Sequence, residues 1–67
     1  MKFYKIQTTD DETLFINASH IYAISKNEDD EIEIYMYDDI ITTVDFTTID
    51  QAMEYLDITT NRGEHHD

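Results

Sequence analysis

The sequence predicts an α+β fold: a small antiparallel β-meander of about four strands, with one C-terminal helix packed on one face of the sheet. Apolar and polar residues alternate at period two over most of the chain, and after Phe46 the apolar spacing becomes helical. The 40% hydrophobic residues argue against disorder, which so acidic a composition otherwise favours. A chain of 67 residues forms one domain with a small core, and without cysteine no disulfide reinforces it.

Short polar turns separate the expected strands. Asn17 and Ser19 mark one of these turns, because their side chains bond the local backbone readily. The clearest strand is the segment in which Ile32, Ile34 and Met36 alternate with polar or aromatic residues. The alternating segments, in chain order, are residues 4–8, 13–17, 21–25, 32–37 and 40–46.

The last hairpin allows two registers. A two-residue loop at residues 38–39 would place Asp45 opposite Ile32, in the row of core residues. A loop one residue longer places Val44 opposite Ile34 and keeps the apolar residues on one face. We therefore expect the three-residue loop, with one loop residue in the left-handed conformation, which Asp or Asn tolerates at modest cost.

The helix is expected at residues 49–57. Thr48 and Gln51 fit a capping box at its start. We expect the domain to span residues 1–58 and residues 59–67 to form a mobile tail, because the tail lacks any period. The apolar stripe of the helix consists of Ile49, Ala52, Met53 and Leu56.

The charge of the chain indicates a class of partner. Sixteen Asp and Glu face four Lys and Arg, so the formal net charge is -12. Such a charge repels nucleic acid and anionic membranes and attracts basic protein surfaces, above all those that hold phosphate backbones. No segment has the apolar length of a membrane helix or of a signal peptide, so we expect a cytoplasmic protein without a membrane partner.

The topology places much of this acid at one end. In a meander, successive turns fall at alternate ends of the sheet, so the first and third turns share an end. Glu33 and Asp45 would extend the acid along the sheet face that the helix leaves open. The alternative is that the acidic turns only keep a small β-protein soluble and protect its edges. The two turns carry seven carboxylates: Asp10, Asp11, Glu12, Glu28, Asp29, Asp30 and Glu31.

The open face also carries aromatic residues. If Ile34 and its row face the helix, then Tyr35 and Tyr37 point to the other side, together with Ile41 and Phe15. Tyrosine beside acid would supply anchors and charge steering for a basic partner. The alternatives are ordinary cross-strand packing and a homodimer that stacks two open faces.

Catalytic and metal-binding patterns are weak. The single glycine, Gly63, excludes a Gly-rich phosphate loop, and no Ser-His-Asp arrangement is supported by spacing. His20 lies in a turn and is most simply a solvated or locally bonded side chain. Residues 28–31 lack the alternating ligands and the glycine of an EF-hand, and His65 and His66 lie in the expected tail. We expect a non-enzymatic protein without a metal or cofactor.

One family resemblance is visible. The segment Phe15-Ile16-Asn17-Ala18-Ser19-His20-Ile21-Tyr22-Ala23-Ile24, followed by an alternating hairpin and a short helix, is similar to the small flagellar FlbD-type proteins and their phage-borne relatives. The chain departs from that pattern with Ala18 for proline and Asp39 for glycine. The resemblance implies a structural or regulatory module that acts through its aromatic sheet face or as a homodimer.

These observations leave three hypotheses. The first is an inhibitor or regulator that occupies a basic surface of a nucleic-acid-binding enzyme or complex by nucleic-acid mimicry. Its composition resembles that of phage proteins that inhibit restriction, repair or CRISPR enzymes. The second is the FlbD-type module, and the third is a small-molecule or metal binder. Salt separates the first two, because charge-driven binding weakens as salt rises and a hydrophobic interface barely responds.

Overall fold

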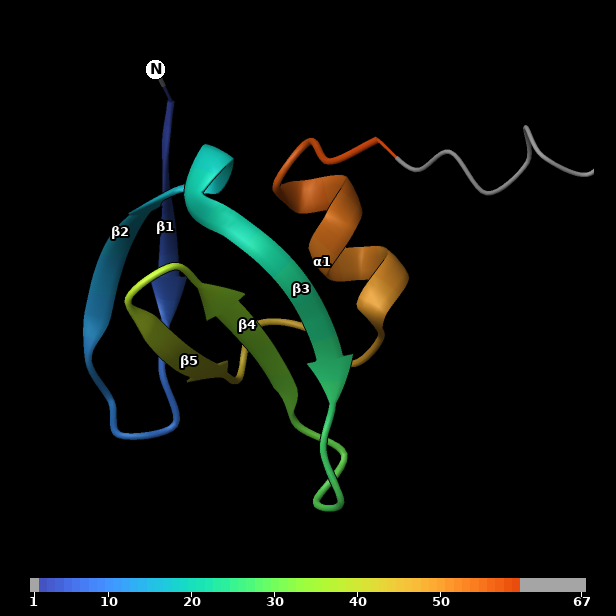
Figure 1. The fold of residues 1–67 in the computed structure, drawn as a ribbon. Coiled ribbons are helices and arrows are strands. Elements are labelled where there is room, and N and C mark those ends of the chain that lie inside the picture. The colour runs from blue at the N-terminus through green and yellow to red at the C-terminus, as the bar shows by residue number, and fades with distance from the viewer. Residues whose placement is uncertain (1, 60–67) are drawn as a thin grey trace, which may run out of the picture.

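The computed structural model describes residues 2–59, which fold as an α+β domain with a C-terminal helix (Figure 1). Of the expected tail, only Thr59 falls within this part of the chain. In chain order the elements are β1 (Phe3–Gln7), β2 (Thr13–Asn17), a 3-10 turn (Ala18–His20), β3 (Ile21–Lys26), β4 (Ile32–Met36), β5 (Asp39–Thr43) and α1 (Ile49–Tyr55).

The expected single meander of about four strands is replaced by five strands in two antiparallel sheets. β1 pairs with β2, and β3, β4 and β5 form the second sheet in that order. The 3-10 turn separates the sheets: the Asn17 side chain accepts a bond from the Ser19 backbone N–H at 3.0 Å, and the chain changes direction before β3. β2 and β3 are therefore not paired.

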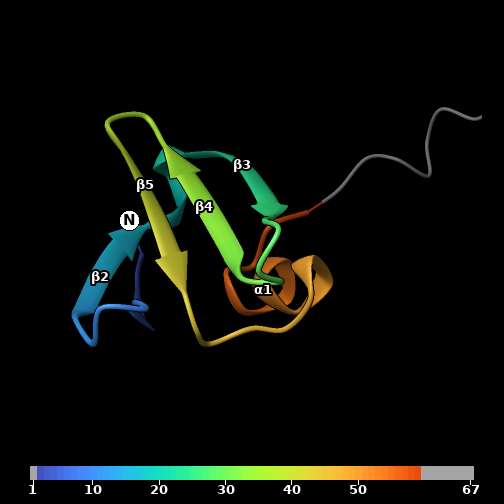
Figure 2. The same cartoon turned by 90° about the horizontal axis from the view of Figure 1, so that it is seen from below.

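A bridge between Thr8 and Thr43 joins the two sheets at one point. Backbone bonds flank it, from Thr9 N–H to Thr42 O at 3.0 Å and from Val44 N–H to Gln7 O at 3.2 Å. The end of β1 thus continues the larger sheet beyond β5. Figure 2 shows the β1–β2 hairpin on the β5 side of this sheet and α1 on the β3 side.

The expected register of the last hairpin is wrong. β4 and β5 are joined by a two-residue loop, Tyr37 and Asp38, which begins one residue earlier than either loop considered from the sequence and shifts the pairing of β5 by two or three residues. Ile34 then faces Ile41 across the strands, and Ile32 faces Thr43. Neither loop residue has a positive φ.

Two polar contacts explain this register. Thr43 is buried in the core row, and its hydroxyl donates to Gln7 O at 2.7 Å, so no polar atom is left unsatisfied there. Asp45 lies beyond the end of β5, where its carboxylate accepts from Gln7 N–H at 2.8 Å. Ile41, expected on the open face, is consequently only 7% exposed, whereas Val44 is 57% exposed.

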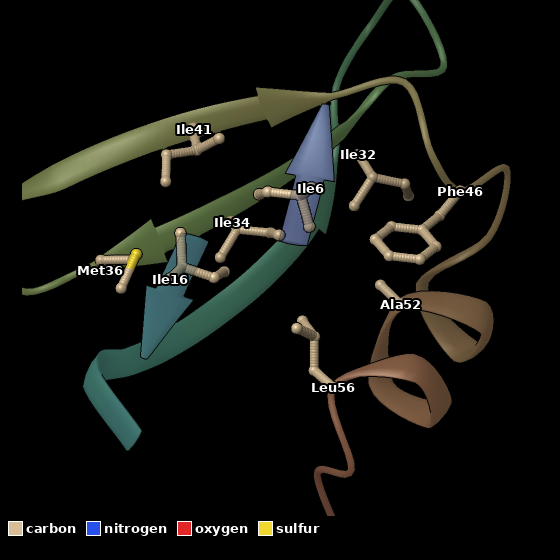
Figure 3. Close-up of a cluster of buried hydrophobic side chains, with 9 residues drawn as sticks. All are labelled: Ile6, Ile16, Ile32, Ile34, Met36, Ile41, Phe46, Ala52 and Leu56. Atoms are coloured by element: carbon tan, nitrogen blue, oxygen red, sulfur yellow. The ribbon is translucent and has the colours of Figure 1, made fainter. Parts of the chain in front are cut away.

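The core lies between the larger sheet, the β1–β2 hairpin and α1 (Figure 3). Both sheets contribute alternate residues of their inner faces, and the helix contributes its apolar stripe. Burying each large side chain stabilises the fold by about 1.5–3 kcal/mol. The buried apolar residues are Ile6, Ile16, Ile32, Ile34, Met36, Ile41, Phe46, Ala52 and Leu56.

The helix begins as expected and ends earlier. Thr48 is the N-cap, and its side chain accepts from Gln51 N–H at 3.1 Å, while Gln51 reaches back to Thr47 rather than to Thr48. The helix ends at Tyr55, because Asp57 adopts a left-handed conformation with φ 59°. The Tyr55 hydroxyl donates to Lys5 O at 2.8 Å and ties the helix to β1. Within residues 2–59, no helix reaches the length and hydropathy that a membrane crossing requires.

Candidate acidic and aromatic binding surface

The turn between β1 and β2 is a three-residue hairpin loop that a threonine holds in place. Thr8 N–H donates to Glu12 O at 2.8 Å, and Asp11 N–H donates to Thr8 O at 3.1 Å. The Thr8 hydroxyl oxygen accepts from the backbone N–H groups of Asp10 and Glu12 at 3.2 and 3.1 Å. Asp11 has φ 67°, so it takes the left-handed position that completes this loop type.

The turn between β3 and β4 has the same construction. Asn27 N–H donates to Glu31 O at 2.9 Å, and Asp30 N–H donates to Asn27 O at 3.0 Å. The Asn27 amide oxygen accepts from Asp29 and Glu31 N–H, both at 2.9 Å. Asp30 has φ 63°. We refer to residues 8–12 and 27–31 as the acidic turns; each ends in Asp-Asp-Glu with the middle Asp left-handed.

Both acidic turns lie at the same end of the molecule (Figure 1). Seen from that end, they occupy opposite sides of the larger sheet, so the acid forms two groups (Figure 2). Six of the seven carboxylate residues are exposed, and Glu31 is half-buried. The seven turn residues singled out from the sequence therefore share one end of the molecule without forming one cluster.

Little basic charge offsets these carboxylates. Within the described residues, the one lysine or arginine in ion-pair range of an acidic turn is Lys26, whose Nζ lies 4.0 Å from the Asp30 carboxylate. This pair is largely exposed, and exposed pairs contribute at most about 1 kcal/mol. The other ion pair joins Lys2 and Asp57 at 3.9 Å, outside the acidic turns.

A depression of about 180 Å³ lies between the first acidic turn and β5. Asp10, Glu12 and Asp39 line it together with threonine and aliphatic side chains. Carboxylates beside aliphatic side chains suit the head and stem of a partner's lysine or arginine side chain. Within residues 2–59, no three His, Cys, Asp or Glu side chains are grouped to hold a metal ion. His65 and His66 lie outside the described residues.

Glu33 connects the second acidic turn to the open face of the larger sheet. Its carboxylate accepts from the Asn27 amide at 3.2 Å and from the Tyr35 hydroxyl at 3.0 Å. Glu33 thus lies on the open face, as expected. Asp45, expected beside it, instead bonds Gln7 and adds its charge next to the first acidic turn.

Three tyrosines form a row on the open face. Tyr22 stacks on Tyr37 with ring centroids 6.1 Å apart and planes 7° apart, and it meets Tyr35 edge-on at 6.2 Å. His20 extends the row, with its ring 5.8 Å from that of Tyr37. Tyr22 and Tyr37 are 62% and 72% exposed, whereas Tyr35 is half-buried. We call Tyr22, Tyr35 and Tyr37 the tyrosine row.

Tyr22 and His20 were not among the partner-binding residues predicted from the sequence, although His20 was expected to lie at the surface. A β-bulge between Ile21 and Ala23 shifts the pairing of β3, so Ile21 and Ile24 both pack against the core and Tyr22 points outward. The sequence signal is the three-residue spacing of these isoleucines, which a regular strand cannot place on one face. Phe15, expected on the open face, is exposed on β2 opposite Lys5, in the other sheet.

Comparison of the chain with protein-family models, with curated proteins and with solved structures found no match.

Proposed function

We propose that this protein is a non-enzymatic inhibitor or regulator that occupies a basic, nucleic-acid-binding surface of a partner protein. The observation that carries the proposal is the pair of acidic turns, which repeat one backbone structure at one end of the molecule and expose carboxylates with, among residues 2–59, a single weak lysine contact. A partner that binds phosphate backbones presents Lys and Arg in grooves of matching charge.

Pre-organisation supports this role. In each acidic turn the backbone N–H groups are already bonded to the Thr8 or Asn27 side chain, so binding need not order the loop. Because ordering a loop costs free energy on association, a fixed loop that presents free carboxylates binds more tightly than a flexible one of the same charge. The tyrosine row, joined to the second turn through Glu33, supplies apolar anchor area.

The proposal has a more specific form. The partner is an enzyme or complex of the cytoplasm that handles nucleic acid, and the protein acts as a nucleic-acid mimic of the kind that phage use against restriction, repair or CRISPR enzymes. The charge distribution favours mimicry over direct nucleic-acid binding, since a net charge of -12 repels phosphate.

A second function is favoured by the tyrosine row. Two stacked tyrosines that are each more than half exposed form apolar area of the kind found at protein interfaces. In this alternative the protein is an interaction module, of the type that the FlbD resemblance implies, and it acts through the open sheet face or as a homodimer.

Competition by nucleic acid separates the two functions. The protein is immobilised, host-cell lysate is passed over it, and captured protein is eluted with salt or with duplex DNA or RNA. The acidic-turn variant carries Asp10→Asn, Glu12→Gln, Glu28→Gln and Asp29→Asn, which remove charge and keep the left-handed Asp11 and Asp30. The tyrosine variant carries Tyr22→Ser and Tyr37→Ser.

Mimicry predicts that nucleic acid and salt both elute the captured protein and that the acidic-turn variant captures none. The opposite result is that the acidic-turn variant still captures the partner, nucleic acid does not elute it, and the tyrosine variant no longer captures it. That result would contradict mimicry and favour the interaction module.

A further inference from the structure

One edge of the larger sheet is open. β3 pairs with β4 only, and among residues 2–59 its one other backbone bond is at its first residue, where Ile21 N–H donates to Ala18 O in the 3-10 turn. The strand contains no proline and no acidic residue, and its only charge is Lys26 at its end. Natural sheets commonly protect such an edge with charges, proline or a covering segment. From Ala23 to Lys26 the pairing with β4 is regular, so this stretch can template another strand.

An apolar hollow of about 190 Å³ lies beside this edge, between β3 and the end of α1. The far wall of the hollow is formed where α1 ends in a C-capping motif. There, Ile58 N–H donates to Met53 O at 2.9 Å, and Asp57 N–H donates to Glu54 O at 3.2 Å. This pair of bonds turns Ile58 back beside Met53. The hollow is lined by Ile21, Tyr22, Ala23, Ile24, Met53 and Ile58.

The helix side of the hollow is acidic. Asp50 and Glu54 follow one another at helical spacing on the side of α1 next to Met53, Asp57 comes just after the end of α1, and all three are exposed. Their one ion-pair contact within the described residues is with Lys2 at 3.9 Å. The second acidic turn follows β3 directly. Acid thus flanks both the hollow and one end of the open edge.

We propose that the edge of β3 binds an extended, basic segment of the partner protein as an additional antiparallel or parallel strand. Backbone groups of the segment pair with β3, an apolar side chain enters the hollow, and neighbouring Lys or Arg residues contact the acidic side of α1. This inference rests on the proposed function and names the structural element of the partner that is bound.

Charge decides between this occupant and a second copy of the chain. Two copies joined edge to edge would each bring a net charge of -12 and would place acid beside acid at the hollow. A basic segment instead offsets the acid that flanks the edge. Strand addition gives affinity through main-chain bonds and selectivity through alternate side-chain pockets, which matches an open edge beside one apolar hollow.

The test is an NMR titration of the isotope-labelled protein with a blocked peptide of alternating lysine and valine. We expect the amide signals of Ala23 to Lys26 and the methyl signals of Met53 and Ile58 to shift. The same peptide N-methylated at alternate residues loses backbone donors at unchanged charge, and it should not bind.

Two variants with equal charge change provide the matched comparison. Ala23 is exposed on β3, and Thr13 is exposed on β2, the edge strand of the other sheet. Ala23→Lys should weaken peptide binding at least about tenfold, which corresponds to about 1.4 kcal/mol, and Thr13→Lys should leave it unchanged. Met53→Glu, at a half-buried position of the hollow, provides a second disruption if Ala23→Lys lowers the melting temperature.

Equal binding of the N-methylated peptide, or equal loss in the two lysine variants, would overturn the inference in favour of unspecific charge attraction. Concentration-dependent shifts at β3 without peptide would overturn it in favour of self-pairing. If the peptide fails to bind while acidic-turn neutralisation still abolishes partner capture, the strand inference fails and the proposed function stands.

Discussion

The acidic turns and the tyrosine row differ in which part of their residues is held by contacts within the domain. In the turns it is the backbone, and in the row it is the side chains. In the acidic turns the backbone is held by its own bonds and by the Thr8 and Asn27 side chains. Within residues 2–59, only two of the seven turn carboxylates have a partner: Asp30 lies 4.0 Å from Lys26, and Glu31 accepts from the Asn27 amide at 3.3 Å. In the tyrosine row the side chains contact one another, and Tyr35 also bonds Glu33. The comparison teaches that the charge remains available to a partner, whereas part of the aromatic area is already used within the domain.

Removing the side chain that holds a turn has the largest expected effect. Asn27→Ala deprives the Asp29 and Glu31 N–H groups of their acceptor and should lower the free energy of unfolding by about 1–2 kcal/mol. Asn27→Asp keeps an acceptor at the same position and should cost less. Urea unfolding measures both. Equal stability of Asn27→Ala and the wild type would mean that the turn is not held by this side chain.

Replacing the left-handed Asp30 with glycine should stabilise the second acidic turn. Asp30→Gly removes the steric cost of φ 63° and one negative charge, so we expect a gain of about 1 kcal/mol. Asp29→Gly removes the same charge from a residue without a positive φ and should give no such gain. Thermal melts of the two variants isolate the conformational effect. Equal melting temperatures would assign the whole change to charge.

Disturbing the tyrosine row should have a smaller effect on folding. Tyr22→Ala removes two ring contacts from an exposed side chain and should cost about 0.5–1 kcal/mol. A double-mutant cycle with Tyr37→Ala measures the stacking itself. A loss of several kcal/mol would show that the row belongs to the structural core and would remove the contrast with the acidic turns.

Salt should produce the smallest change in stability. Because the chain repels itself at a net charge of -12, raising sodium chloride from low concentration to about 0.15 M, where the Debye length is about 8 Å, should raise the melting temperature slightly. The acidic-turn variant should respond less. A melting temperature that falls with salt would indicate that ion pairs outweigh repulsion.

Sequence reasoning identified the right turn chemistry and assigned it to the wrong hairpin. A three-residue loop with a left-handed Asp was expected after Tyr37, and it occurs instead at Asp11 and Asp30. The recurring pattern Thr8-x-Asp-Asp-Glu and Asn27-x-Asp-Asp-Glu carries the local signal, because its first residue caps the loop.

The features that escaped prediction depend on distant contacts. The register of β5 is set by Thr43 and Asp45, both bonded to Gln7 on a strand more than thirty residues away in sequence, and alternation within the hairpin cannot reveal those bonds. The split into two sheets follows from the 3-10 turn at Ala18–His20. In contrast, the α+β class, the helix N-cap and the exposure of the acid follow from local patterns, so they were predictable.

The salt dependence of partner affinity shows directly whether the acidic turns bind the partner through their charge. The dissociation constant of the captured partner is measured by isothermal titration at several salt concentrations for the wild type, the acidic-turn variant and the tyrosine variant. We expect a steep loss of affinity with salt in the wild type, a shallower slope in the acidic-turn variant, and weaker binding with an unchanged slope in the tyrosine variant. An acidic-turn variant with the wild-type slope and affinity would contradict this expectation.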